Sequence, residues 1–348
     1  MHMRSSGSNR PLLLVTAGLV AVAAIVAAIL ASSGGGGGSR TAARLETSSA
    51  DRGFSRAYEE AARKALPSVV QIQSGGKLGS GVVFNGSGDI VTNAHVVAGS
   101  RTFQVITSDG KQHSGTLQGT FPAGDLAVVH IDGGNLTAAR LGDSSKLKVG
   151  EAVLALGSPL GLRSSVTNGI VSAVSRTVSE GNGVALSSVV QTSAPINPGN
   201  SGGALVNLSA EVVGIPTLAA VDPELGGTAP GVGFAISSNN VKAIAGQLVD
   251  QGHVTSSGRA YLGVELRSLQ SGGVLIVGVV RGGPADDAGL NPGDVIVSVA
   301  GRPVASADDV AVALAQHRPG EKVPVKVVHQ DGSTATVQVK LGELPAGG

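Results

Sequence analysis

Short runs of Val and Ile, interrupted every few residues by Gly, Asn or Asp, are the feature that most limits the fold of this chain. About a dozen such runs lie between Ser68 and Ile236, and no long helical pattern separates them. β-branched residues favour strands, and strands at this spacing are typical of β-barrels and sandwiches. The 53 Gly among 348 residues are about twice average usage, as many tight turns require. The sequence therefore predicts a mainly β fold.

Composition and charge exclude several classes of function. The formal net charge is +1 and no long Lys/Arg run is present, which argues against nucleic acid as a partner. The chain has no Cys, so disulfides, a thiol nucleophile and Cys-ligated metals are excluded. We predict neither a metal nor a cofactor.

The N-terminal region has the pattern of a membrane segment. Leu12 to Ala31 form an uncharged apolar run of 20 residues preceded by Arg4 and Arg10. At about 1.5 Å per residue this run can just span a bilayer core of roughly 30 Å, and the arginines place the N-terminus in the cytoplasm. A cleavable signal peptide is the alternative. We expect a cytoplasmic end (1–10), an anchor or signal peptide (11–31) and a flexible Gly/Ser linker (32–53).

The remaining chain is too long for a single ordinary core, so two folded domains are expected. The first, over 54–252, begins with an amphipathic helix at 54–66, continues with the strand-rich region and closes with a helix at 241–249. The second, a small α+β domain over 258–345, contains a helix that opens at Ser306, with Asp309 three residues on as in a capping box.

One segment carries the clearest chemical signal. Ser201 lies in the run GNSGG, where a Gly-rich turn can bring backbone N–H groups together. The run also fits G-x-S-x-G of α/β-hydrolases, but that fold needs a helix after the serine and its acid and histidine downstream. His95 ends one apolar strand and Asp125 opens another, giving the order histidine, aspartate, serine of chymotrypsin-type sites. His130 is the nearest competing histidine, and we interpret it as structural.

Several spaced motifs together resemble the HtrA (DegP-like) serine proteases. They are TNAHVV (92–97), GDLAV (124–128) and NPGNSGGAL (197–205), supported by GSP (157–159) and GFAI (233–236). The resemblance covers residues 65–345. It implies a chymotrypsin-like double β-barrel protease followed by a PDZ domain, cleavage of unfolded or damaged exported proteins, and a homotrimer joined around Phe54 and Tyr58.

The resemblance also implies a role for each site residue. Ser201 would attack the peptide carbonyl, His95 would move the proton, and Asp125 would orient the imidazole. The N–H groups of Gly199 and Ser201 would form the oxyanion hole. In the second domain, the loop that resembles a PDZ carboxylate-binding loop would hold peptide C-termini and through them regulate cleavage. Its residues are Tyr261, Leu262, Gly263 and Val264.

The chain departs from the family pattern before the nucleophile. Pro195 stands where members usually have an alanine in Asp-Ala-Ala, and no acid is present at this position. A preference for Lys or Arg before the cut is therefore not expected, and a small aliphatic residue is the hypothesis. The alternative function is a tethered PDZ peptide-binding or chaperone scaffold with a latent protease domain.

Overall fold

The computed structural model describes residues 49–345 except 134–135, 159–164, 182–183, 198, 223–226 and 271. The N-terminal segment at 12–31 lies outside these residues. In the described part of the chain, no helix is both long and apolar enough to cross a membrane.

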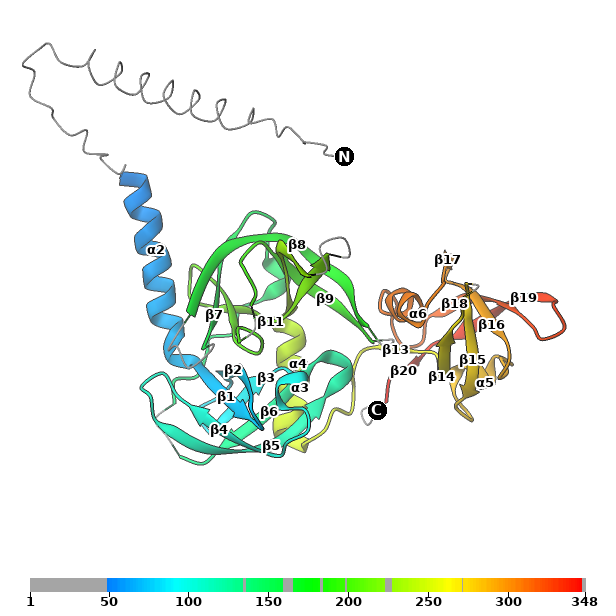
Figure 1. Ribbon diagram of the computed structural model, residues 1–348, viewed down its shortest axis with the longest axis horizontal. Helices are drawn as coiled ribbons and strands as arrows, with labels where there is room; N and C mark the ends of the chain where they lie inside the picture. Colours follow the sequence, from blue (N-terminus) through cyan, green and yellow to red (C-terminus); the bar gives the residue numbers. More distant parts are fainter. Residues whose placement is uncertain are drawn as a thin grey trace, which may run out of the picture. The chain divides into compact units, whose positions relative to one another are not determined.

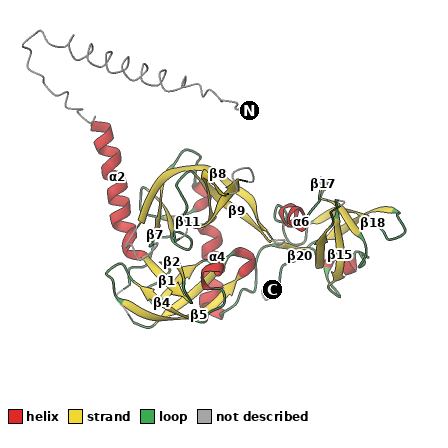
Figure 2. Cartoon of the chain, in the orientation of Figure 1, coloured by secondary structure: helices red, strands yellow, loops and turns green. Residues whose placement is uncertain are grey.

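Two closed antiparallel barrels form most of the described chain (Figures 1 and 2). In the first, the strands are ordered β1-β2-β3-β6-β5-β4, and β1 pairs with β4 to close it. In the second, the order is β10-β11-β12-β9-β8-β7, closed by β7 and β10. The predicted mainly β, double-barrel fold is confirmed.

The first barrel comprises β1 (Val69–Ser74), β2 (Lys77–Val83), β3 (Asp89–Thr92), β4 (Thr102–Ile106), β5 (Gln112–Phe121) and β6 (Leu126–Ile131). The second comprises β7 (Ala152–Gly157), β8 (Ser165–Gly181), β9 (Val184–Thr192), β10 (Ala204–Asn207), β11 (Val212–Asp222) and β12 (Gly227–Ser237).

Helices lie at the start and end of this region and beside β3. Helix α2 (Ser49–Ala65) begins five residues before the predicted start at Phe54, and a 3-10 turn containing Pro67 follows it. Helix α3 (Ala94–Val97) is a single turn. Helix α4 (Ser238–Gln251) extends beyond the predicted 241–249 and ends at Gly252, whose left-handed φ of 71° is typical of a helix C-terminus.

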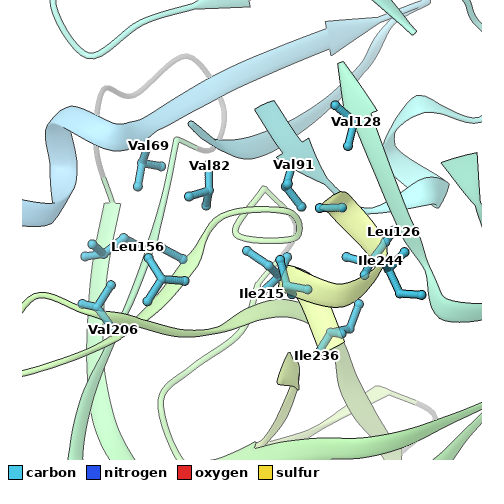
Figure 3. Close-up of a cluster of buried hydrophobic side chains, with 14 of the residues drawn as sticks. Val69, Val82, Val91, Leu126, Val128, Leu156, Val206, Ile215, Ile236 and Ile244 are labelled. Atoms are coloured by element: carbon cyan, nitrogen blue, oxygen red, sulfur yellow. The ribbon is translucent and has the colours of Figure 1, made fainter. Parts of the chain in front are cut away.

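The main apolar cluster lies between the two barrels (Figure 3). Strands of the first barrel supply Val82, Val91 and Leu126, and strands of the second supply Leu156 and Ile215. Helix α4 packs against strands of both barrels. Each barrel also has its own smaller core. Burial of such side chains contributes roughly 1.5–3 kcal/mol each, so this cluster fixes how the two barrels meet.

The C-terminal domain is an antiparallel sheet with two short helices and its own core. Strand β14 begins at Val264, because Gly263 before it adopts a left-handed φ of 78° that interrupts the extended run. The sheet contains β14 (Val264–Ser268), β15 (Val274–Val279), β16 (Val295–Val299), β18 (Lys322–Val328) and β19 (Thr334–Lys340), with β17 (Arg302–Pro303) beside β16. The other elements are the pair β13 (Ala260–Tyr261) and β20 (Gly342–Glu343), and the helices α5 (Pro284–Asp287) and α6 (Ala307–Leu314).

The capping box at the start of α6 is present as predicted. The Ser306 hydroxyl accepts the Asp309 N–H, and the Asp309 carboxylate accepts the Ser306 N–H in return. Two hydrogen bonds hold the pKa of the Asp309 carboxyl below its usual value. The larger effect comes from the Ala305 N–H and the next from the Ser306 hydroxyl. This contribution to stability is present above the unfolded-state pKa and is lost as pH falls through the lowered folded-state pKa.

We expect Ser306→Ala to destabilise the C-terminal domain by about 1 kcal/mol, because an N-terminal donor of α6 loses its acceptor. Calorimetry of the domain's unfolding transition measures this. Ser333→Ala is the matched control, since it removes an exposed turn hydroxyl that donates to Asp331 in the same domain. An equal fall in the unfolding temperature of both variants would contradict the prediction.

Candidate active site

His95 lies in α3, directly after β3. Its neighbours Ala94, Val96 and Val97 are buried and hold this single turn against the first barrel. The His95 side chain is half exposed. The apolar residues on both sides therefore fix the backbone while the imidazole stays accessible.

Asp125 lies against the imidazole of His95. It follows the single turn Pro122–Gly124 and adopts a left-handed φ of 48°, which Asp tolerates better than most residues. Its carboxylate is buried, accepts the His95 N–H at 3.1 Å and lies 2.9 Å from Nδ1. The Asn93 amide donates to the Asp125 carbonyl oxygen at 3.0 Å. A carboxylate at Nδ1 selects the tautomer with its proton there and gives Nε2 the lone pair.

Thr217 connects this pair to the serine. Its hydroxyl donates to Oδ2 of Asp125 at 2.5 Å, and its carbonyl oxygen accepts the Ser201 hydroxyl at 3.2 Å. Thr217 is buried on β11, in the second barrel. No sequence motif indicated this residue. Its signal was a hydroxyl directly after Pro216, within the otherwise apolar run 212–221.

Ser201 lies in a tight turn before β10, and this turn packs against the first barrel. A Cβ atom at Gly202 would lie 2.2 Å from the Ser80 carbonyl oxygen, and Gly202 has a φ of 80°. At Gly157 a Cβ atom would lie 2.8 Å from the Asn200 Cα. Real Cβ atoms essentially never approach so closely, so glycine is required at both positions.

Two backbone donors lie beside the serine. In the part of the chain that the structure describes, the N–H groups of Gly199 and Ser201 donate no hydrogen bond. By contrast, the Asn200 N–H between them donates to the Asn197 carbonyl oxygen at 3.0 Å. The turn thus leaves two N–H groups on the nucleophile segment available for an external acceptor.

The competing histidine has a different partner. His130 Nδ1 lies 2.7 Å from the buried carboxylate of Asp89, a pair that belongs to the first barrel and does not include Asp125. Among the described residues, no three His, Asp or Glu side chains gather closely enough to hold a metal.

The predicted carboxylate loop borders a groove in the C-terminal domain. Leu262 is buried, its carbonyl accepts the Ala285 N–H, and the Gly263 carbonyl accepts the Val280 N–H. The N–H groups of Leu262 and Gly263 donate no hydrogen bond within the described residues. A cavity of about 320 Å³ lies beside them. Its lining in this domain includes Tyr261, Leu262, Gly263, Val264, Leu266, Val310, Ala311 and Leu314.

Comparison with known protein families agrees with both halves of this arrangement. Residues 79–215 match the trypsin-like peptidase domain family, and residues 260–341 match the PDZ domain family. Fold and site therefore define a trypsin-like double barrel followed by a PDZ domain.

Similarity to individual proteins over both domains identifies the protein family. The chain is 40% identical over 308 residues to serine protease PepD of Mycobacterium tuberculosis, covering 82% of this chain and 66% of the relative. It is also 40% identical to the serine protease Do-like HtrA of Lactobacillus helveticus, covering 76% of this chain and 68% of that protein. The chain belongs to the HtrA family of serine proteases. It spans about two thirds of these relatives, and 57% of a DegP-like relative from Ectopseudomonas mendocina.

Solved structures give the same result. The HtrA-type protease AlgW with a decapeptide has a TM-score of 0.56 and 31% identity, covering 83% of this chain and 99% of that one. The serine endoprotease from Yersinia pestis has a TM-score of 0.56 and 34% identity, covering 82% of this chain and 98% of its own.

Proposed function

We propose that this chain is a serine endopeptidase that cleaves unfolded or damaged exported proteins, with its protease domain over 54–252 and its PDZ domain over 258–345. The observation that carries the proposal is the connected set His95, Asp125, Thr217 and Ser201 at the junction of the two barrels. Because the buried carboxylate holds the imidazole by Nδ1, proton transfer uses Nε2 as the basic nitrogen.

The reaction follows from these positions. Ser201 Oγ attacks the scissile carbonyl carbon while His95 takes the hydroxyl proton. Asp125 stabilises the resulting imidazolium. His95 then gives the proton to the leaving amine, and a water molecule, activated by the same imidazole, hydrolyses the acyl-enzyme. In the resting structure the Ser201 hydroxyl donates to Thr217, and a side-chain rotation redirects it to the base.

The free N–H groups of Gly199 and Ser201 supply the oxyanion hole. Negative charge develops on the carbonyl oxygen only in the transition state, so donors fixed beforehand stabilise that state selectively. Each such donor contributes about 3 kcal/mol in comparable enzymes.

Cleavage of an unfolded protein such as casein by the purified full chain tests this proposal. We expect hydrolysis that a serine-directed fluorophosphonate blocks through covalent attachment to Ser201, located by mass spectrometry. Hydrolysis that persists after complete labelling of Ser201 would disprove the assignment.

Thr217→Val is expected to lower kcat about tenfold to hundredfold, because the Asp125 carboxylate loses a charge-assisted hydrogen bond worth about 1.5–3 kcal/mol. Steady-state hydrolysis of a peptide substrate measures the change. Thr217→Ser keeps the hydroxyl and should retain most of the activity. Equal activity of the Val and Ser variants would show that the hydroxyl contributes nothing to the reaction.

The PDZ groove is proposed to bind peptide C-termini and to activate cleavage. The free N–H groups of Leu262 and Gly263 suit a carboxylate, and the apolar lining suits the last side chain of a peptide. The similar HtrA-type protease AlgW has been solved with a decapeptide.

Ala311→Arg should weaken binding of a C-terminal peptide at least tenfold, because a long charged side chain would enter the apolar groove that Ala311 lines. Fluorescence anisotropy measures the affinity. Val312→Arg is the control. Val312 is the neighbour of Ala311 in α6 but lies outside both the groove lining and the domain core. Loss of basal cleavage in Ala311→Arg without loss of peptide affinity would contradict the assignment.

A small aliphatic residue is proposed before the cut. Pro195 is exposed, and its carbonyl accepts the Thr167 hydroxyl at 2.8 Å, which fixes a neutral segment six residues before Ser201. A peptide library cleaved mainly after Lys or Arg would contradict this.

Residues 12–31 are proposed to anchor the chain in the cell membrane, with both domains on the extracytoplasmic side. The support is their apolar sequence and the periplasmic relatives of the DegP-like type. Extraction of the full chain from membranes by carbonate alone would count against the anchor.

A homotrimer joined around Phe54 and Tyr58 is proposed on the family resemblance. Phe54 on α2 is 62% exposed, which leaves its ring available for a neighbouring copy. Analytical ultracentrifugation that showed only monomer would remove this proposal.

A further inference from the structure

Ser80 connects the first barrel to the nucleophile segment of the second. It is fully buried on β2, and its N–H donates to the Ser201 carbonyl oxygen at 3.0 Å. Its hydroxyl donates to the Gly199 carbonyl oxygen at 2.5 Å and accepts the Ser158 N–H at 2.8 Å. Its own carbonyl accepts the Thr92 hydroxyl at 2.7 Å. A single serine thus contacts the strand before His95 and the turn that holds Ser201.

The hydroxyl holds one particular peptide plane. The carbonyl of the Gly199–Asn200 peptide accepts the Ser80 hydroxyl, and the N–H of that peptide donates to Asn197. The N–H groups of Gly199 and Ser201 belong to the peptides on either side of this plane. Gly199 has a φ of 101°, and a glycine can rotate its peptides at little steric cost. With the plane held at both ends, this freedom is removed.

The strand on both sides of Ser80 is closely packed against the first barrel. A Cβ atom at Gly79 would lie 2.6 Å from Val96, and one at Gly81 would lie 2.6 Å from Ile90. The strand and the nucleophile turn are in direct backbone contact at Ser80, because a Cβ atom at Gly202 would lie 2.2 Å from the Ser80 carbonyl oxygen. A hydrogen bond in such a dry site is stronger than one in water, and its loss leaves a buried carbonyl without its donor.

We propose that Ser80 is a positioning residue for the oxyanion hole: its hydroxyl fixes the Gly199–Asn200 peptide so that the N–H groups of Gly199 and Ser201 point at one acceptor. This inference rests on the proposed protease function. It adds a requirement that the triad alone does not contain, because Ser80 touches none of its three side chains through a hydrogen bond within the described residues.

The test compares Ser80→Ala with Ser238→Ala in the full chain. Ser238, the first residue of α4, is a matched control. Its buried hydroxyl also donates to a main-chain carbonyl, that of Gly142, at 2.9 Å. Steady-state hydrolysis of a peptide, labelling by a fluorophosphonate and thermal unfolding are measured for each protein. In Ser80→Ala we expect kcat and the labelling rate to fall about tenfold or more, with KM within twofold of wild type. In Ser238→Ala only the unfolding temperature should fall.

The pH profile separates a positioning role from a structural one. Because none of the hydrogen bonds of Ser80 within the described residues reaches His95 or Asp125, the acidic limb of kcat/KM should keep its midpoint in Ser80→Ala while its plateau falls. Ser80→Cys, which nearly preserves volume with a weaker donor, should be folded and intermediate in kcat.

Each result decides between the hypotheses. Wild-type kcat in both Ser80 variants would overturn the inference and leave the protease function intact. An equal fall of kcat in Ser80→Ala and Ser238→Ala would reduce Ser80 to a structural residue. A wild-type chain that neither cleaves peptides nor reacts with the fluorophosphonate would overturn the proposed function, and this inference with it.

Discussion

Ser201→Ala is expected to lower kcat for peptide hydrolysis by about 10⁴-fold or more, because no other group can form the acyl-enzyme once Oγ is removed. The substitution deletes one hydroxyl whose hydrogen bond is to the Thr217 carbonyl oxygen, so the fold should persist. Cleavage of casein by the full-length variant, followed by gel and mass spectrometry, measures the effect.

The control for Ser201→Ala is binding of a C-terminal peptide, which should be unchanged since the PDZ groove contains none of the substituted atoms. Retained casein cleavage would show that another nucleophile performs the reaction. Cleavage by neither wild type nor variant, even with added C-terminal peptides, would favour the tethered scaffold as the function.

Asp125→Asn is expected to lower kcat at neutral pH by about 10⁴-fold, as the equivalent change does in a comparable triad. The carboxylate accepts from the His95 N–H and the Thr217 hydroxyl and lies against the imidazole Nδ1. An amide in its place presents an NH₂ group to Nδ1, which moves the imidazole proton to Nε2 and removes the base. Single-turnover hydrolysis across a pH range measures the loss.

Asp89→Asn is the matched control for Asp125→Asn. Asp89 is also a buried carboxylate beside a histidine, His130, but it belongs to the first barrel alone. We expect lower stability with kcat near that of wild type. Similar losses of kcat in the two variants would mean that Asp125 acts only by supporting the fold.

Two kinds of feature could be predicted from the sequence: those that depend on residues close together in the chain, and those that depend on the order of motifs along it. The capping box of Ser306 and Asp309 depends on residues three apart, and it is present. The order of His95, Asp125 and Ser201 limits the fold because only a few architectures bring such distant residues together. The strand-rich texture predicted a mainly β fold, and the family resemblance implied the two barrels, whose topology the structure confirms.

Thr217 and Ser80 could not be predicted in the same way. Each acts through contacts between strands and turns far apart in the sequence, and each looks like an ordinary polar residue within a strand. The start of α2 was missed for a related reason. Its first turn, from Ser49, precedes the apolar residues Ala61 and Ala65 that pack into the core, so no amphipathic signal marks it.

The division of the site between two barrels also determines when the chain can become active during its synthesis. The base and the acid come from the first barrel, whereas the serine and Thr217 come from the second, which is made later. The strands of the first barrel are complete while the nucleophile has yet to be added. A nascent chain therefore carries no complete set of His95, Asp125, Thr217 and Ser201 until β11 has been made and has closed against the first barrel.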